Sequence, residues 1–106
     1  MLANTPEPPY YAVIFSTIRT SVDEGYEDTA AAMVELAKKQ EGYLGIESVR
    51  NDIGITISYW SSLDAITQWK NNIEHTEARK LGRELWYEKY ELRICKVERA
   101  YGFEKM

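Results

Sequence analysis

The sequence predicts an α+β domain, because segments with two different periodicities follow one another along the chain. Side chains alternate at the strand period of two in four segments, at 10–19, 43–50, 55–60 and 87–101. Apolar residues recur at helical spacing in two further segments, at 26–40 and from Ser61 to about Ile73. The resulting order β-α-β-β-α-β is that of the ferredoxin-like sandwich.

The first two segments are a leader and a strand. Residues 1–9 contain three prolines, which remove backbone hydrogen-bond donors, so we expect a flexible leader before a single domain over residues 10–106. From Tyr10 to Arg19 both faces of the alternating segment are apolar. Such a strand belongs at the centre of a sheet that is covered on both sides.

A helix is expected from Tyr26 to Gln40, with acidic residues in its first turn and lysines in its last, as the helix dipole favours. Gly42 is suited to end this helix. A hairpin follows, in which the residues from Asn51 to Gly54 form the turn between two strands.

The second helix begins at a capping-box pattern, Ser61-Ser62-Leu63-Asp64, which places Ser61 at the N-cap. The apolar stripe of the helix includes Trp69 and ends near Ile73. Helical character is expected to continue beyond it until Gly82 interrupts the helix.

The last strand is expected to run from Tyr87 to Tyr101. Its apolar residues change phase near Ile94–Cys95, which predicts either a β-bulge or a switch of partner sheet there. Cys95 has apolar neighbours and is expected to be a buried, unreactive thiol. Three tyrosines of the strand are expected to pack in a subunit interface: Tyr87, Tyr90 and Tyr101.

Two helices cover only one face of a four-stranded sheet, yet these strands carry apolar and aromatic residues on both faces. The second face therefore needs a cover, and a second copy of the chain is the simplest one. We expect a homodimer in which the long last strand serves as an arm.

Charge and composition limit the partners and the location. The chain has 13 Lys and Arg against 17 Asp and Glu, a formal net charge of −4. Nucleic acids and anionic membranes favour clustered basic residues, so neither is expected as a partner. A single cysteine, no signal-peptide pattern and no long apolar run favour a cytoplasmic protein.

No motif predicts a bound metal or cofactor. One histidine and one cysteine cannot supply the usual zinc ligand sets, and the sequence has no glycine-rich phosphate-binding loop. We therefore expect no metal and no cofactor.

Three stretches carry a resemblance to a known family: AKKQEGYLGIESVR, GITISYW and WKNNIEHTEARKLGRELWYEKYELRICKVERAY. From Tyr11 to Tyr101 the sequence resembles the antibiotic biosynthesis monooxygenase superfamily of dimeric α+β barrels, and most of all its small bacterial branch of uncharacterised members. The resemblance implies the barrel that two such sheets form together. Members share this shape but differ in their chemistry.

The resemblance also implies a pocket between the sheet and the second helix. Some members use no metal or flavin there, because the carbanion of the substrate itself reduces O₂. The function implied for this chain is a cofactor-independent monooxygenase of a small aromatic or polyketide-like phenol or quinol. The implied site consists of the pocket residues Trp60, Trp69, Asn72 and Trp86 and the catalytic residues His75 and Arg79.

The haem-degrading branch of the superfamily matches this chain less well. That branch has an asparagine on the first strand, a tryptophan on the second helix and a haem-ligating histidine ten positions later. Trp69 matches the tryptophan, but the tenth position after it is Arg79, and a protonated guanidinium cannot ligate iron. The first strand has no asparagine.

Each candidate residue also has a purely structural interpretation. His75 is either a general base, since imidazole titrates near neutral pH, or a surface histidine of the helix. Arg79, four residues later, either holds a substrate anion or pairs with a nearby glutamate. The tryptophans either line a ligand pocket or fill the core. The alternative function is a non-catalytic dimer that binds a small ligand or acts in a stress response.

Overall fold

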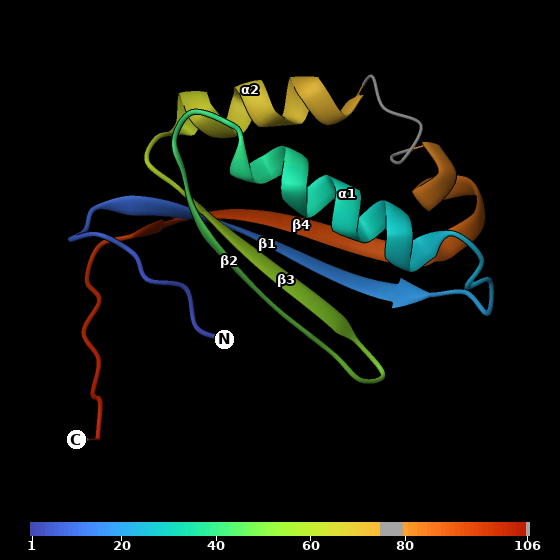
Figure 1. The fold of residues 1–106 in the computed structure, drawn as a ribbon, viewed down its shortest axis with the longest axis horizontal. Helices are drawn as coiled ribbons and strands as arrows, with labels where there is room; N and C mark the ends of the chain where they lie inside the picture. The colour runs from blue at the N-terminus through green and yellow to red at the C-terminus, as the bar shows by residue number, and fades with distance from the viewer. Residues whose placement is uncertain (75–79, 106) are drawn as a thin grey trace.

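The computed structural model describes residues 1–74 and 80–105, which form one antiparallel sheet with both helices on one side (Figure 1). In chain order the elements are β1 (Tyr10–Arg19), α1 (Tyr26–Lys38), β2 (Tyr43–Arg50), β3 (Gly54–Trp60), α2 (Leu63–Glu74), the short π-helix η1 (Gly82–Trp86) and β4 (Tyr87–Val97). The strand order β2-β3-β1-β4 confirms the ferredoxin-like fold. None of the helices in this part of the chain is long and apolar enough to cross a membrane.

Strand β1 lies at the centre, antiparallel to β3 on one side and to β4 on the other, as its two apolar faces predict. Val13 pairs with Ser58 of β3 and with Ile94 of β4, so these side chains point to one face of the sheet. Val13 belongs to the core that the helices cover, and this face is therefore the helix side. The opposite face, termed the open face, carries the residues between them, among them Ala12, Ile14, Ile57, Tyr59, Arg93 and Cys95.

The core is centred on Trp60, whose side chain is fully buried. Residues from both helices and from β1 to β3 surround it: Val13, Ala37, Ala65 and Ile66, with Tyr11, Tyr43 and Trp69 at the edge. The Trp60 indole N–H donates to Ser58 Oγ at 2.9 Å. The indole N–H therefore keeps a hydrogen-bond partner although the side chain is buried, as buried polar groups in proteins generally do.

Gly42 forms the corner between α1 and β2, with a φ of +87° that favours glycine. A Cβ at this position would lie only 2.5 Å from the Cβ of Ala65 and 2.8 Å from Ser61 Oγ. The Gly42 carbonyl also accepts a hydrogen bond from the Ser61 N–H at 2.8 Å. The absence of a side chain thus lets the start of α2 pack against the corner. Helix α1 itself ends at Lys38 and not at the expected Gln40.

Helix α2 is capped by Ser62 and not by Ser61, so the expected capping box is wrong. The helix begins at Leu63, and Ser62 Oγ accepts a hydrogen bond from the Ala65 N–H at 3.1 Å. This is the bond that an N-cap side chain makes to the third helical residue. The backbone N–H of Ser61 is used instead to hold the preceding corner.

Strand β4 ends at Val97, before the predicted end at Tyr101. Val97 pairs with Tyr10, the first residue of β1, so the neighbouring strand extends no further. The predicted bulge near Ile94–Cys95 is also wrong, because pairing with β1 is regular there. The shift in register lies at the other end of the strand pair, next to Ile18.

The open face has no helix over it (Figure 1), and several of its side chains are exposed in the single chain. Ile18 is 41% exposed and Val49 is 66% exposed. Cys95 is exposed as well, so the expectation of a buried thiol is wrong for the single chain. The apolar open face is what motivated the prediction of a homodimer.

Candidate ligand-binding site

Two of the three tryptophans meet at one end of the sheet. The rings of Trp60 and Trp69 stack with their centroids 5.8 Å apart and their planes inclined by 26°, and Tyr43 meets Trp60 edge-on at 5.7 Å. Trp60 is fully buried, whereas Trp69 on α2 is only half-buried. Trp60 therefore supports the Trp69 ring from the core, and Trp69 keeps exposed surface for a ligand.

Trp86 lies at the opposite end of the sheet. It directly precedes β4, which begins opposite the end of β1, whereas Trp60 pairs with Tyr11 at the start of β1. The Trp86 indole N–H donates to the Glu24 carbonyl oxygen at 3.1 Å, and the side chain is buried. Of the three predicted pocket tryptophans, the structure thus brings Trp60 and Trp69 together and places Trp86 elsewhere.

An aromatic cluster fills the helix side of the sheet next to Trp86. Phe15 of β1 contacts Tyr87 and Tyr90 of β4, with ring centroids 5.5 and 5.3 Å apart. Tyr26 of α1 contacts Trp86 and Tyr87 at 5.7 and 6.0 Å. This position of Tyr87 and Tyr90 on the helix side differs from the subunit interface expected for them.

The polar atoms of this cluster are used within it. The Tyr87 hydroxyl donates to Tyr26 Oη at 3.4 Å. Burial raises the pKa of Tyr87, and the hydrogen bond with Tyr26 adds to the increase, so Tyr87 keeps its proton to a higher pH than an ordinary tyrosine. The Arg19 guanidinium lies 3.5 Å from the centroid of the Tyr26 ring, a cation–π contact. The hydroxyls of Tyr26 and Tyr87 and the Arg19 guanidinium are therefore engaged in contacts within the cluster, which makes the cluster structural rather than catalytic.

Between the two groups of aromatic residues, β4 presents apolar side chains that the helices leave uncovered. Leu92 and Ile94 are 46% and 50% exposed, although they pair with Phe15 and Val13 and so point to the helix side. At one end of this strip Arg83 of η1 donates through Nε to Tyr90 Oη at 3.0 Å. We term this strip the β4 surface, defined by Phe15, Tyr90, Leu92 and Ile94. It is the candidate ligand-binding surface.

The remaining predicted site residues lie on or after α2. Asn72 is exposed, and its side-chain amide donates to Gln40 Oε1 at 2.8 Å, which ties α2 to the end of α1. His75 and Arg79 lie outside the described residues, in the connection between α2 and Lys80. Their catalytic roles therefore stay predictions.

A separate open hollow of about 470 Å³ lies where β1 leads into α1, lined by Arg19, Asp23, Gly25, Glu27 and Asp28. None of the predicted pocket residues lines it. The Arg19 guanidinium already donates to Asp23 Oδ1 at 3.0 Å and to the Val22 carbonyl at 2.9 Å. Three carboxylates beside one paired guanidinium favour neither an anion nor an apolar ring, so the β4 surface remains the candidate site.

Within residues 1–74 and 80–105, no three His, Cys, Asp or Glu side chains lie close enough together to hold a metal ion. The only histidine of the chain, His75, lies outside these ranges. The expectation of a protein without metal or cofactor therefore stays a prediction.

Sequence reasoning named the tryptophans and missed the β4 surface. A signal was present, since the alternation places Tyr90, Leu92 and Ile94 on one face of the last strand. That the two helices leave this face of β4 uncovered depends on how they cross the sheet. The residue pattern of a single strand does not contain that information.

Comparison with known proteins identifies the family. The family model described as antibiotic biosynthesis monooxygenase matches residues 9–81, which is more than half of the chain. The uncharacterized protein YqjZ of Bacillus subtilis is 52% identical in sequence, in an alignment that covers 98% of this chain and 93% of YqjZ.

Solved structures show the same fold at low sequence identity. SnoaB, a cofactor-independent oxygenase from Streptomyces nogalater, is similar with a TM-score of 0.74 and 12% identity, covering 88% of this chain and 97% of SnoaB. A conserved protein from Methanosarcina mazei Go1 has a TM-score of 0.74 and 14% identity, covering 85% of this chain and 94% of that protein. By its family match and its relation to YqjZ, this chain belongs to the antibiotic biosynthesis monooxygenase family.

Proposed function

We propose that the protein is a cofactor-independent monooxygenase that acts on a small aromatic or polyketide-like phenol or quinol bound at the β4 surface. The observation that carries the proposal is the position of Leu92 and Ile94, which are apolar, half exposed and on the helix side. Membership of the family, and the fold shared with the cofactor-independent oxygenase SnoaB, support the class of reaction.

A flat aromatic ligand suits this surface better than a charged one. Covering Leu92 and Ile94 gains roughly 25 cal/mol for each Å² of apolar area removed from water. Phe15 and Tyr90 add aromatic rings, which stack on a ligand or meet it edge-on. Trp60 and Trp86, being buried, act in this proposal by holding Trp69 and the Tyr26 cluster in place.

The proposed reaction needs a base, an acidic C–H or O–H group and O₂. His75 removes the proton, and Arg79 stabilises the resulting anion. The carbanion gives one electron to O₂, and the two radicals combine to a peroxide anion at that carbon. This anion takes back the proton from His75 and becomes a hydroperoxide. Loss of water then turns a CH₂ carbon into a carbonyl, so one oxygen atom enters the product and the other leaves as water.

Oxygen uptake with a panel of anthrones and hydroxynaphthoquinones tests the proposal. Wild-type protein is expected to consume O₂ with at least one member of the panel, and His75→Ala is expected to lower kcat by about 100-fold. Lys80→Ala, just beyond the connection, serves as the control and is expected to keep wild-type kcat. No O₂-dependent turnover, or unchanged kcat in His75→Ala protein, would contradict the proposal.

Binding without turnover would favour the alternative function. Native mass spectrometry is the measurement, because it records a bound small molecule together with the oligomeric state. A ligand-loaded dimer that consumes no O₂ with any member of the panel would identify a non-catalytic binding protein.

We further propose that the protein acts as a homodimer that buries the open face. Sedimentation velocity is expected to give twice the chain mass of 12.3 kDa at micromolar concentration. Val49→Lys, which charges the open face, is expected to raise the dissociation constant by more than about tenfold. Ile53→Lys is the matched control, because Ile53 is equally apolar and 53% exposed but lies in the hairpin turn. A wild-type monomer would contradict this proposal.

A further inference from the structure

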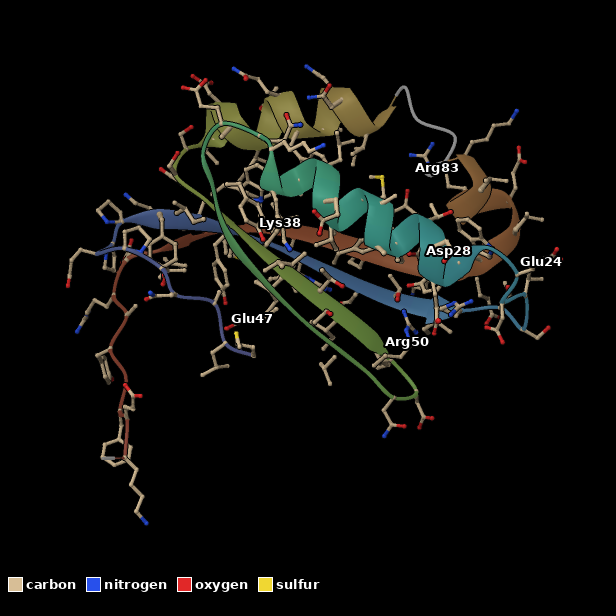
Figure 2. All side chains as sticks on the ribbon, in the orientation of Figure 1. Glu24, Asp28, Lys38, Glu47, Arg50 and Arg83 are labelled. Atoms are coloured by element: carbon tan, nitrogen blue, oxygen red, sulfur yellow. The ribbon has the colours of Figure 1, made fainter. Side chains whose placement is uncertain are left out.

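The residues predicted to be a flexible leader, 1–9, are attached to the open face at Glu47. One Glu47 carboxylate oxygen accepts a hydrogen bond from the Ala3 N–H at 2.9 Å, and the other accepts one from the Tyr59 hydroxyl at 2.7 Å. Figure 2 shows the Glu47 side chain reaching from β2 toward the leader. Hydrogen bonds to a charged carboxylate are stronger than those between neutral groups. We term this arrangement of Ala3, Glu47 and Tyr59 the clasp.

The titration of Glu47 agrees with this geometry. The hydrogen bond from Tyr59, followed by that from the Ala3 N–H, holds the pKa of Glu47 below its ordinary range. Both donors favour the ionised carboxylate. At neutral pH the clasp is therefore fully charged and at its strongest.

The sheet beneath the leader leaves room for it. A Cβ on Gly45 would lie 2.8 Å from the Cβ of Ala3, so the close approach of the leader to β2 requires glycine there. Further along the leader, Thr5 Oγ1 and Tyr10 Oη are hydrogen-bonded at 2.9 Å. The Tyr10 ring in turn meets the Tyr59 ring edge-on, with centroids 5.8 Å apart. The leader is thus joined to the open face at two points.

Two residues of the open face are buried although no helix lies over them. Tyr10 and Ala12 are each 4% exposed in the single chain. The contacts of Thr5 with Tyr10, and of Tyr10 with Tyr59, lie at this end of the sheet. By contrast Ile18, at the other end of β1, keeps 41% exposure. The leader therefore contacts the end of the open face at which these two residues are buried.

We propose that the leader is a fixed strap that forms part of the surface on which a second copy of the chain docks. The clasp fixes Ala3 beside Glu47 of β2, and Leu2, the residue before Ala3, is 84% exposed. Val49, two residues after Glu47 on the same face of β2, is 66% exposed. A large apolar side chain that is already held in place loses less conformational entropy on burial than one on a flexible segment. The inference rests on the proposed homodimer. It adds that the strap and the open face of the sheet form one surface that binds the second copy.

Hydrogen exchange at the Ala3 amide, measured by NMR, tests the clasp. Glu47→Gln preserves the shape of the side chain but removes its charge, and Gly45→Val places a side chain where Ala3 lies. Both changes are expected to speed Ala3 exchange about tenfold. Leu2→Asn and Gly102→Val are controls that should leave it unchanged, since a Cβ on Gly102 meets nothing within 4 Å. Equal Ala3 exchange in wild-type and Glu47→Gln protein would overturn the strap.

The dissociation constant of the dimer, from sedimentation at a series of concentrations, tests the docking role. It is expected to rise about tenfold in Glu47→Gln, Gly45→Val and Leu2→Asn and to stay unchanged in Gly102→Val. A Leu2→Asn protein that dimerises as tightly as wild type overturns the docking role. So does a tighter dimer in Glu47→Gln, because the leader would then obstruct the second copy.

The two measurements separate this inference from the proposal on which it rests. A wild-type chain that stays monomeric overturns both the homodimer and the docking role. A wild-type dimer whose dissociation constant is unaffected by all three variants overturns the docking role alone.

Discussion

Position 42 requires glycine for two separate reasons. Its backbone adopts a φ of +87°, and its missing side chain leaves space for Ala65 and Ser61 at the start of α2. The sequence indicates the first requirement, because glycine after a helical segment is a common helix stop. The second requirement depends on a helix that begins about twenty residues later, and a local pattern does not show it.

Replacing Gly42 by alanine is expected to lower the free energy of unfolding by about 2–4 kcal/mol, from backbone strain together with overlap against Ala65. Urea denaturation followed by tryptophan fluorescence measures the change. Gly102→Ala, where a Cβ meets nothing within 4 Å, is the control and should change stability by less than about 0.5 kcal/mol. Equal stability of the two variants would contradict the geometry at this corner.

Tyr59 predicts a dependence of stability on alkaline pH. Burial, together with the hydrogen bond to Glu47, raises the pKa of Tyr59 to about 12. Because the folded-state pKa exceeds the ordinary value of about 10, the contribution of Tyr59 is fully present below pH 10 and is lost as the pH rises toward 12. Tyr59→Phe is expected to remove this part of the pH dependence between pH 10 and 12, measured by denaturation at each pH.

The exposed Tyr101 provides the control for that experiment, since Tyr101→Phe should leave the alkaline profile unchanged. Glu47 gives the opposite sign, because its pKa is lowered in the folded state. Its contribution is present above the ordinary glutamate range and is lost as the pH falls through the lowered pKa. An alkaline profile of Tyr59→Phe that matches wild type would contradict the raised pKa of Tyr59 in the folded protein.

At the scale of elements, the sequence predicts those features of a helix or strand that depend only on its own residues. The bounds of β1 are as predicted, because its alternation of apolar residues begins and ends within Tyr10–Arg19. The end of β4 is not, because the strand stops where β1 offers no further partner. Where β4 ends depends on where β1 begins, and the two strands lie far apart in the sequence. The alternation that runs on to Tyr101 within one segment is therefore misleading.

The cap of α2 gives a prediction at this scale. Both Ser61 and Ser62 are candidate caps by residue type, but Ser62 Oγ makes the bond to the Ala65 N–H. Ser62→Ala is expected to lower the free energy of unfolding by about 1 kcal/mol, and Ser61→Ala by less than about 0.5 kcal/mol. Thermal or urea denaturation of the two variants checks the order. A larger loss in Ser61→Ala would restore the capping box that the sequence indicates.

At the scale of the whole molecule, the fold could be predicted from the sequence and the candidate site only in part. The order of strands and helices follows from periodicity, and the family model matches residues 9–81, which include every element from β1 to α2. The sequence names the three tryptophans as candidate pocket residues, but their spacing does not show that Trp60 and Trp69 stack while Trp86 lies at the other end of the sheet. The β4 surface arises only when both helices are in place.

The central claim is that an aromatic substrate is oxidised on the helix side of β4, and two isoleucines test it most directly. Ile94 faces the helix side of β4 and Ile53 lies in the hairpin turn between β2 and β3, and both are about half exposed. Oxygen uptake with a turned-over anthrone or hydroxynaphthoquinone is the measurement, comparing Ile94→Asn with Ile53→Asn. Ile94→Asn is expected to lower kcat/KM about tenfold or more, because a polar group then faces the ligand, whereas Ile53→Asn should stay within about twofold of wild type. Equal rates in the two variants, or a loss confined to Ile53→Asn, would contradict a substrate site at the β4 surface.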